Sequence, residues 1–328
     1  MTIPLVCPQD RCELTPLDSG LVFYCSDCCR EYPVVEGVVR FVGAADQFYE
    51  GAYKNRVKYV PRSERWYAAW PLWLINGGFL WRTRREVRAG GTILEIGCAS
   101  GVRYFARRYR MIGLDLSHSS LTTIAGVYRI ALQADATRGI PLPSASVDAV
   151  ISSYFWEHID PAVKPLILEE CHRVLKPGGK LIFLYDVDTQ NPLVAHMRRV
   201  DRALYSRLFL EQDGHVGYQS LDENKAIFQS VGFQVLRHFG MERTPVQSTS
   251  VYEKLSQWPT GIRVIGSVGR RFGTRPWFRP YTLIVRVIDE TIGRLLPREW
   301  ARIALTVCVR LPNGAPAIPA GVTGDIVG

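Results

Sequence analysis

The stretch LEIGCASG, at residues 94–101, is a turn of small residues between an apolar run and a predicted helix. Such a turn between a strand and a helix lets a ligand approach the backbone and directs amides at the helix start toward it. A dinucleotide fingerprint would need glycine at three positions, where the sequence has Gly97, Ala99 and Val102. The Gly-Lys-Ser or Gly-Lys-Thr end of a P-loop is also missing. The turn therefore suits neither a pyrophosphate nor a triphosphate.

Asp115 ends the next apolar run along the chain. At the carboxyl end of a second parallel strand, a carboxylate can accept both hydroxyls of a ribose. A nucleoside without a pyrophosphate satisfies both the turn and the aspartate. Together they predict S-adenosylmethionine as the ligand.

From Thr92 onward, short apolar runs alternate with helical patterns. An amphipathic helix is predicted within residues 160–179, with Ile167, Cys171 and Val174 on one face. This alternation predicts an α/β fold with a parallel sheet and crossover helices. The predicted strands cover residues 92–97, 110–117, 131–136, 147–154, 180–186, 233–241 and 303–311.

Five blocks between residues 92 and 186 follow one another in a known order: LEIGCASG, GLDLS, ADATRGIPLPSASVDAVIS, WEHI and RVLKPGGKLIF. In this order they resemble the conserved blocks of class I S-adenosylmethionine-dependent methyltransferases, in particular those that act on small molecules, lipids and sugars. The resemblance implies a Rossmann-like, seven-stranded methyltransferase sheet with helices on both faces. Ala99 stands where the family has the middle glycine of its loop, and its small size predicts little effect.

The resemblance assigns the cofactor contacts residue by residue. It implies that the loop lines the methionine end, that the acid after the second strand holds the ribose, and that the third and fourth strands end beside the adenine and the sulfonium. The implied residues are Glu95, Gly97, Cys98, Gly101, Asp115, Leu116, Asp135, Ala136 and Ser152.

A base for the acceptor's proton is the remaining requirement of methyl transfer to a hydroxyl. His215 lies in EQDGHVGYQS, on a connection that resembles the acceptor-facing segment of enzymes that methylate small molecules and glycans. A histidine's ordinary pKa suits the task. His158, in the WEHI block, is the alternative.

Cysteines are concentrated near the N-terminus, in two turns that flank a hairpin-like pattern. Cys7, Cys12, Cys25 and Cys28 supply four soft ligands, which predicts a structural Zn²⁺ in tetrahedral coordination. Cys29 is an alternative to Cys28. This segment, with its Tyr-Pro, Glu-Gly and Arg-Phe tail at 32–41, resembles the short zinc ribbons that precede some methyltransferase domains.

The predicted organisation has six parts. These are a zinc-ribbon-like segment at 1–43, a helical lead-in at 44–90, an S-adenosylmethionine-binding core at 91–243, a helical substrate-cover insertion at 244–300, the last core strand at 301–311, and a flexible tail at 312–328.

The formal net charge of the 328 residues is +9, which favours an anionic partner. Residues 261–279 carry five arginines and no acid, with apolar residues between them. They predict a basic cover over an anionic or lipid-linked acceptor, or a peripheral contact with a membrane surface. With no signal peptide and no long apolar run in the sequence, we expect a cytoplasmic protein.

Three functions are considered for a chain with these sequence features. The first is methylation of an oxygen or nitrogen in a small-molecule, glycan or lipid-linked acceptor of a biosynthetic pathway. An RNA methyltransferase would also explain the charge and the cysteines, but ISSYFWEHI replaces the Pro-Pro-Tyr type motif of base methylation. A non-catalytic methyltransferase-like subunit conflicts with the intact loop and Asp115. The residues predict no oligomeric state.

Overall fold

The structure, a computed structural model, describes residues 3–42, 78–244, 249–259, 261–273, 284–285, 287–289 and 291–311. The predicted lead-in therefore lies outside the described residues except for its end, where α3 (Phe79–Glu86) is helical. The tail predicted at 312–328 and part of the basic stretch, 274–279, also lie outside them.

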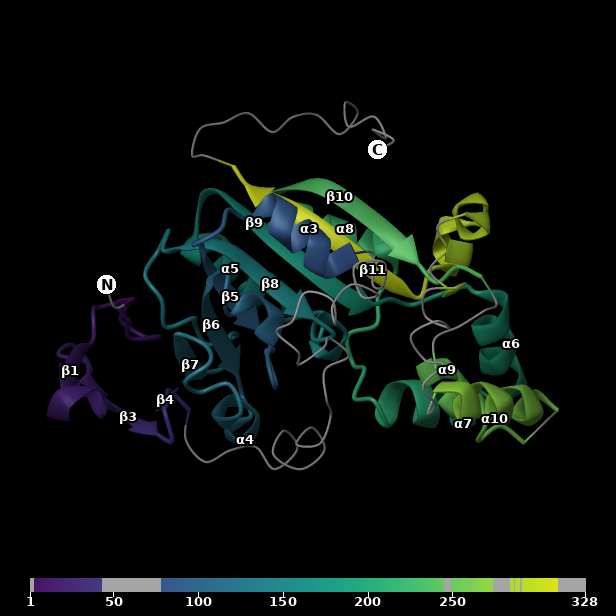
Figure 1. Cartoon of the computed structure of the whole chain (residues 1–328), viewed down its shortest axis with the longest axis horizontal. Coiled ribbons are helices and arrows are strands. Elements are labelled where there is room, and N and C mark those ends of the chain that lie inside the picture. Colours follow the sequence, from purple (N-terminus) through teal and green to yellow (C-terminus); the bar gives the residue numbers. More distant parts are fainter. Residues whose placement is uncertain are drawn as a thin grey trace.

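The centre of the molecule is a sheet with the order β7-β6-β5-β8-β9-β11-β10 (Figure 1). Neighbouring strands from β7 to β9 are parallel, whereas β11 runs antiparallel to both β9 and β10. The predicted α/β fold with a methyltransferase-type sheet is confirmed. The strands are β5 (Thr92–Ile96), β6 (Arg110–Asp115), β7 (Ile130–Gln133), β8 (Val147–Ser153), β9 (Leu175–Asp186), β10 (Phe233–Met241) and β11 (Ile303–Arg310).

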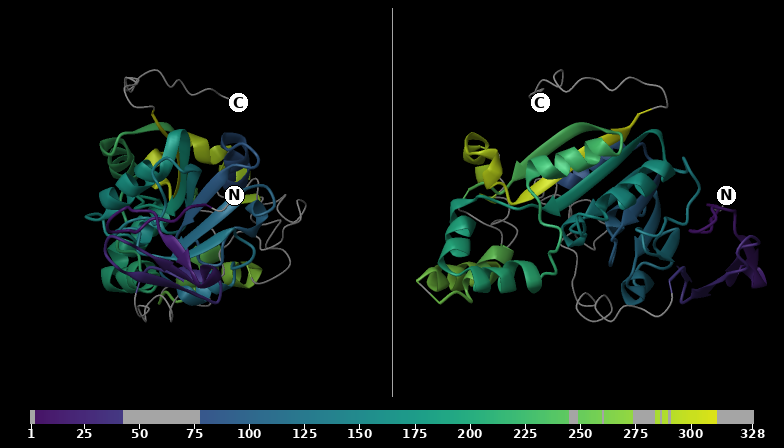
Figure 2. Two further views of the ribbon diagram at one scale, coloured as in Figure 1. Left: turned by 90° about the vertical axis from the view of Figure 1, so that its left-hand side faces the viewer. Right: turned by 180° about the vertical axis from the view of Figure 1, so that it is seen from behind.

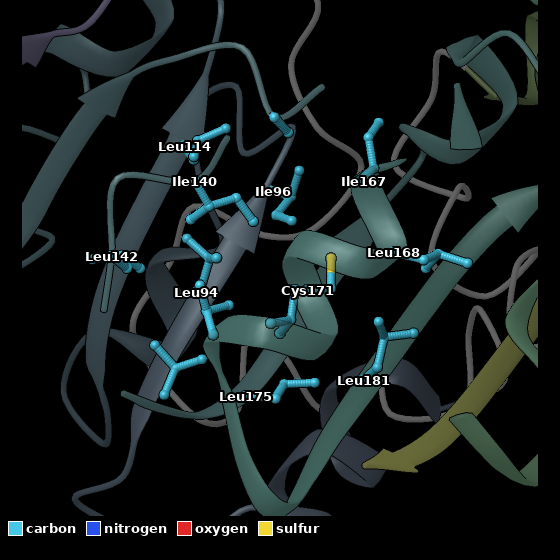
Figure 3. Close-up of a cluster of buried hydrophobic side chains, with 14 of the residues drawn as sticks. Leu94, Ile96, Leu114, Ile140, Leu142, Ile167, Leu168, Cys171, Leu175 and Leu181 are labelled. Carbon is cyan, nitrogen blue, oxygen red and sulfur yellow. The ribbon is translucent and has the colours of Figure 1, made fainter. Parts of the chain in front are cut away.

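Helices cover both faces of this sheet (Figure 2). On one face lie α5 (Lys164–Val174) and α8 (Leu221–Ser230), and on the other lie α3 and α4 (His118–Thr122). Side chains alternate across each strand, so Leu94 and Ile96 join the first core and Ile93 the second. The predicted apolar face of α5 is confirmed: Ile167, Leu168 and Cys171 are fully buried against the sheet (Figure 3).

The N-terminal segment extends the sheet beyond the seven predicted strands. Its β4 (Val38–Arg40) pairs in parallel with β7, and three short strands follow outward: β3 (Glu31–Val35), β2 (Val22–Tyr24) and β1 (Thr15–Leu17). Arg11 also forms a 2.9 Å ion pair with Glu170 of α5. The segment is thus attached to the core through backbone pairing and a side-chain contact.

A separate group of helices lies at the other end of the sheet (Figure 1). It comprises α6 (Pro192–Val200), α7 (Arg202–Tyr205), the π-helical turn Ser206–Glu211, α9 (Thr249–Leu255) and α10 (Ile262–Gly273). These helices have their own apolar cluster, in which Met197 and Phe209 pack with Leu255 and Trp258. Residues 192–211 therefore pack with the insertion rather than on the sheet, which differs from the predicted division of the chain. We call this group the helical cover.

Among the described residues, no helix is long and apolar enough to cross a membrane.

Candidate active site

The predicted cofactor residues lie at the carboxyl ends of four adjacent parallel strands, β5, β6, β7 and β8. This edge is where open α/β sheets bind ligands. The turn after β5 is tight, because Gly97 and Gly101 have φ angles of 59° and 67°. These left-handed values are reached at no cost by glycine.

Asp115 holds this turn in place. Its carboxylate accepts hydrogen bonds from the backbone amides of Ala99, at 2.7 Å, and Ser117, at 2.9 Å. A carboxylate has about four acceptor positions, so hydrogen bonds from loop amides are compatible with a role in binding ribose hydroxyls. The same group can therefore fix the loop and bind the nucleoside.

Glu95 lies beneath the turn and is fully buried. Its carboxylate accepts hydrogen bonds from the Val102 amide and the Tyr128 hydroxyl. Burial, and the negative charge of Glu95 beside it, keep the pKa of Tyr128 well above its ordinary value, so the hydroxyl remains a donor. These contacts give Glu95 a loop-stabilising role; a direct cofactor contact stays a prediction.

Two details of the turn differ from the predictions. Residues 103–105 form a single 3₁₀ turn instead of a longer helix, so the argument from a helix N-terminus does not apply. Ala99 has a φ of 43°, a left-handed value that is unfavourable for residues with a Cβ. The expectation that Ala99 has little effect considered only its size and neglected this backbone conformation.

The remaining cofactor residues surround the turn. Cys98 is fully buried, and its side chain belongs to the same core cluster as Phe79 and Leu80 of α3. The Ser152 hydroxyl donates to the Ile96 carbonyl at 2.9 Å, which joins the ends of β8 and β5. Asp135 accepts from Thr137 and pairs with Arg138. Leu116 is half-buried and Ala136 is buried; their cofactor contacts stay predictions.

The structure brings His158 and His215 together, with ring centroids 4.9 Å apart. His158 belongs to the 3₁₀ turn Trp156–His158 after β8, and His215 precedes α8. Burial, assisted by His158, lowers the pKa of His215 to about 3. The premise that His215 has an ordinary histidine pKa is therefore wrong, because the folded chain removes its ring from water.

Glu157, which the sequence analysis missed, lies beside these histidines, and Asp186 acts on Glu157 in turn. Glu157 is 1% exposed, and burial followed by the charge of Asp186 raises its pKa well above the ordinary value. Burial also raises the pKa of Asp186, at the end of β9, to about 6, with Arg302 opposing the shift. Asp186 could have been predicted from its place at a strand's carboxyl end; Glu157 carries no such signal.

The cysteine turns meet at the outer end of the molecule. The sulfurs of Cys7 and Cys28 lie 3.8 Å apart, and those of Cys12 and Cys25 lie 3.0 Å apart. All four are free thiols. Cys29 is exposed and its sulfur contacts the Ser26 carbonyl, so the folded chain selects Cys28 for the cluster. The residues whose ligand atoms all lie within 4.8 Å of one another are Cys7, Asp10, Cys25 and Cys28, and Cys12 contacts this group through Cys25.

The residues that form this site belong to a part of the chain that resembles known methyltransferases. Residues 94–183 match the family described as a methyltransferase domain. The chain is 31% identical over 169 residues to a probable S-adenosylmethionine-dependent methyltransferase of Mycolicibacterium smegmatis, covering 46% of this chain and 62% of that protein. It is 31% identical over 112 residues to a ubiquinone/menaquinone biosynthesis C-methyltransferase of Syntrophotalea carbinolica, covering 33% and 45%. The matches thus span less than two thirds of these relatives.

Among solved structures, a phosphoethanolamine N-methyltransferase 2 of Haemonchus contortus is 17% identical, with a TM-score of 0.48 over 80% of this chain and 57% of that one. The strand order defines the fold as that of class I S-adenosylmethionine-dependent methyltransferases, and residues 94–183 match a methyltransferase domain.

Proposed function

We propose that this protein transfers a methyl group from S-adenosylmethionine to an oxygen or nitrogen of a small-molecule, glycan or lipid-linked acceptor in a biosynthetic pathway. The observation that supports this most is the position of Asp115, whose carboxylate binds the cofactor loop at the end of β6. A nucleoside bound with its ribose at Asp115 would extend toward the turn at Gly97, which the same carboxylate holds through the Ala99 amide. The loop and the ribose site are thus parts of one binding surface.

When bound, S-adenosylmethionine supplies an already activated methyl group on a sulfonium. The protein's task is then to hold the donor and acceptor in line and, for a hydroxyl acceptor, to manage its proton. Gly97, Gly101 and Asp115 hold the donor. His215 and His158 remain the residues proposed to lie beside the acceptor. His158 belongs to the turn that follows β8, and His215 packs against it.

The cofactor assignment is tested by calorimetry with S-adenosylhomocysteine and with its 2′,3′-dideoxyribose analogue. Asp115→Ala should weaken binding of the parent compound by about 30- to 1000-fold, since losing two charge-assisted hydrogen bonds costs about 2–4 kcal/mol. The wild type should discriminate strongly against the analogue, whereas the variant should not.

The exposed Asp222 on α8 provides a matched control, and Asp222→Ala should bind like the wild type. Undiminished discrimination in Asp115→Ala would reject the ribose assignment. Absence of binding in the wild type would revive the non-catalytic alternative. Binding of RNA with a steep dependence on salt would favour the RNA methyltransferase.

We further propose that Cys7, Cys12, Cys25 and Cys28 bind a structural Zn²⁺. Four thiolates form a closed tetrahedral site without an open position for catalysis. In such a site the sulfurs lie roughly 3.8 Å apart for Zn–S bonds of about 2.3 Å, close to the 3.8 Å between Cys7 and Cys28. The 3.0 Å between Cys12 and Cys25 requires those sulfurs to separate on binding.

Elemental analysis of purified Cys28→Ser and Cys29→Ser variants tests the zinc proposal. Cys28→Ser should lose this zinc and Cys29→Ser should keep it. Equal zinc contents in the two variants would contradict the assignment.

For location, we propose a cytoplasmic protein that contacts a membrane surface through the helical cover. α10 buries Gly266 against the end of α9 and exposes Val264, Ile265 and Val268, at 55–67%. Arg263, Arg270 and Arg271 are exposed on the same helix. Exposed apolar side chains among arginines are typical of helices that lie in an anionic lipid interface, and a lipid-linked acceptor would be reached there.

Co-sedimentation with vesicles of phosphatidylglycerol, compared with phosphatidylcholine, tests this contact. The wild type should bind the anionic vesicles and be released by salt. Val264→Asp with Ile265→Asp should abolish binding, whereas Ser267→Asp, an exposed position on the same helix, should weaken it only slightly. Equal loss in both variants would indicate a charge effect without insertion.

A further inference from the structure

Glu157, His158 and His215 form a compact cluster in which one ligand atom from each residue lies within 4.8 Å of the others. Glu157 and His158 come from the turn after β8, and His215 comes from the connection before α8. Two imidazoles and one carboxylate are the donor set of many open transition-metal sites in proteins. Small side-chain movements would bring the three atoms to coordination distance.

The two most buried members of the cluster are unsatisfied. Glu157 is 1% and His215 is 8% exposed, and the Oε2 atom of Glu157 and the Nδ1 atom of His215 have no hydrogen-bond partner among the described residues. Leaving a buried polar atom without a partner costs free energy. A cation bound within the cluster would satisfy both atoms.

The third member is oriented as a metal ligand would be. His158 Nδ1 lies 3.0 Å from the carbonyl oxygen of Gly214, to which it donates when the proton is on Nδ1. That hydrogen bond places the lone pair on Nε2, the tautomer that metal-binding histidines use when a carbonyl holds their other nitrogen.

The surrounding contacts hold the two segments together. The Gly217 amide donates to the Glu157 carbonyl at 2.8 Å, and the buried Lys164 ammonium donates to the Gly217 carbonyl at 2.8 Å. A side chain at Gly217 would collide with the carbonyl oxygen of Ile159. The absence of a side chain at Gly217 therefore allows the segment that carries His215 to lie directly against residues 157–159.

We propose that Glu157, His158 and His215 bind one divalent transition-metal ion beside the cofactor loop. The site lies two residues along the chain from Phe155, which packs on Gly97. Three protein ligands leave positions open for an oxygen of the acceptor, whose proton a bound metal makes more acidic. This acceptor role rests on the proposed function, but the binding of the ion does not.

The experiment uses the full chain, stripped of metal, loaded with Zn²⁺, desalted and analysed for metal content. The wild type should retain two equivalents, one in each site. Glu157→Gln and His215→Ala should retain one, as should Cys28→Ser, which loses the other ion. His196→Gln, an exposed histidine on α6, should retain two.

Titration with Mn²⁺, followed by electron paramagnetic resonance, separates the sites, since thiolates select zinc whereas imidazole and carboxylate accept manganese. The wild type should bind one Mn²⁺, and binding should weaken at least tenfold in Glu157→Gln and in the half-buried His158→Gln, but not in Cys28→Ser. Circular dichroism and S-adenosylhomocysteine affinity serve as checks of folding.

Unchanged Mn²⁺ binding in the Glu157 and His158 variants, or no Mn²⁺ binding by the folded wild type, would overturn the proposal. Metal binding without any cofactor binding would leave this site intact and contradict the proposed function instead. The two hypotheses thus fail separately.

Discussion

Phe155 packs directly on Gly97, so that a Cβ atom added to Gly97 would lie 2.7 Å from the Phe155 Cβ and closer still to its ring. The contact joins the cofactor loop after β5 to the turn after β8. It therefore places the turn at Gly97 next to the turn that carries Glu157 and His158. Phe155 was not singled out from the sequence, since an aromatic residue after a strand is common.

Gly97→Ala should destabilise the protein by about 2–4 kcal/mol, because it adds both a steric clash and a left-handed alanine. Urea unfolding measures this, and S-adenosylhomocysteine affinity should fall as well. Gly126→Ala separates the two causes, since Gly126 also has a positive φ but open space around it. If both variants lose the same stability, the Phe155 contact contributes nothing.

Ala99→Gly should stabilise the protein by up to about 1 kcal/mol. The substitution removes the cost of a left-handed alanine, which is about 1–2 kcal/mol. It also destabilises the folded state by about 0.4–1 kcal/mol, because glycine gives the unfolded chain more conformational entropy. Thermal unfolding should show a small rise in the midpoint. A clear drop in the midpoint would mean that Ala99 does not adopt the φ of 43° in solution.

Glu170 should make stability depend on pH in the acid range. Burial would raise the pKa of this carboxyl, but hydrogen bonds from Arg173 and the Ile140 amide lower it below its ordinary value. A carboxyl with a lowered folded pKa contributes stability that is present above its unfolded pKa, about 4.3, and is lost as pH falls through the folded pKa.

Unfolding measured from pH 6 down to about pH 3 should therefore show a steeper loss in the wild type than in Glu170→Gln. At neutral pH the variant should be about 1–3 kcal/mol less stable. The exposed neighbour Glu169 gives the control, because Glu169→Gln should follow the wild-type curve. Parallel curves for wild type and Glu170→Gln would refute the prediction.

Gly217→Ala should lower the turnover rate without lowering the affinity for the cofactor. An added Cβ would meet the Ile159 carbonyl, so the segment that carries His215 must move away from Glu157 and His158. Methyl-transfer assays should show at least a tenfold loss, whereas calorimetry with S-adenosylhomocysteine should change little. Gly261→Ala, at an open position, should be neutral in both. A parallel loss of cofactor affinity would show that the effect spreads to the loop.

The sequence by itself determined the seven central strands of the sheet, the cofactor turn and the buried face of α5. Each of these depends on a pattern within a few residues: apolar alternation, small residues after a strand, or Ile167, Cys171 and Val174 at helical spacing. Such patterns report which side of an element is buried, and burial is what drives each element onto the sheet.

Only the tertiary structure decided which distant residues meet. Glu157 and His215 lie far apart in the sequence, and no local pattern reports their contact or the loss of water that lowers the pKa of His215. The same holds for Cys28 over Cys29, because the folded chain brings the Cys28 sulfur to Cys7 and leaves Cys29 exposed. It also holds for residues 192–211, whose apolar side chains pack on the insertion. Desolvation and packing partners are properties of the assembled chain, so they follow from the fold and not from any one segment.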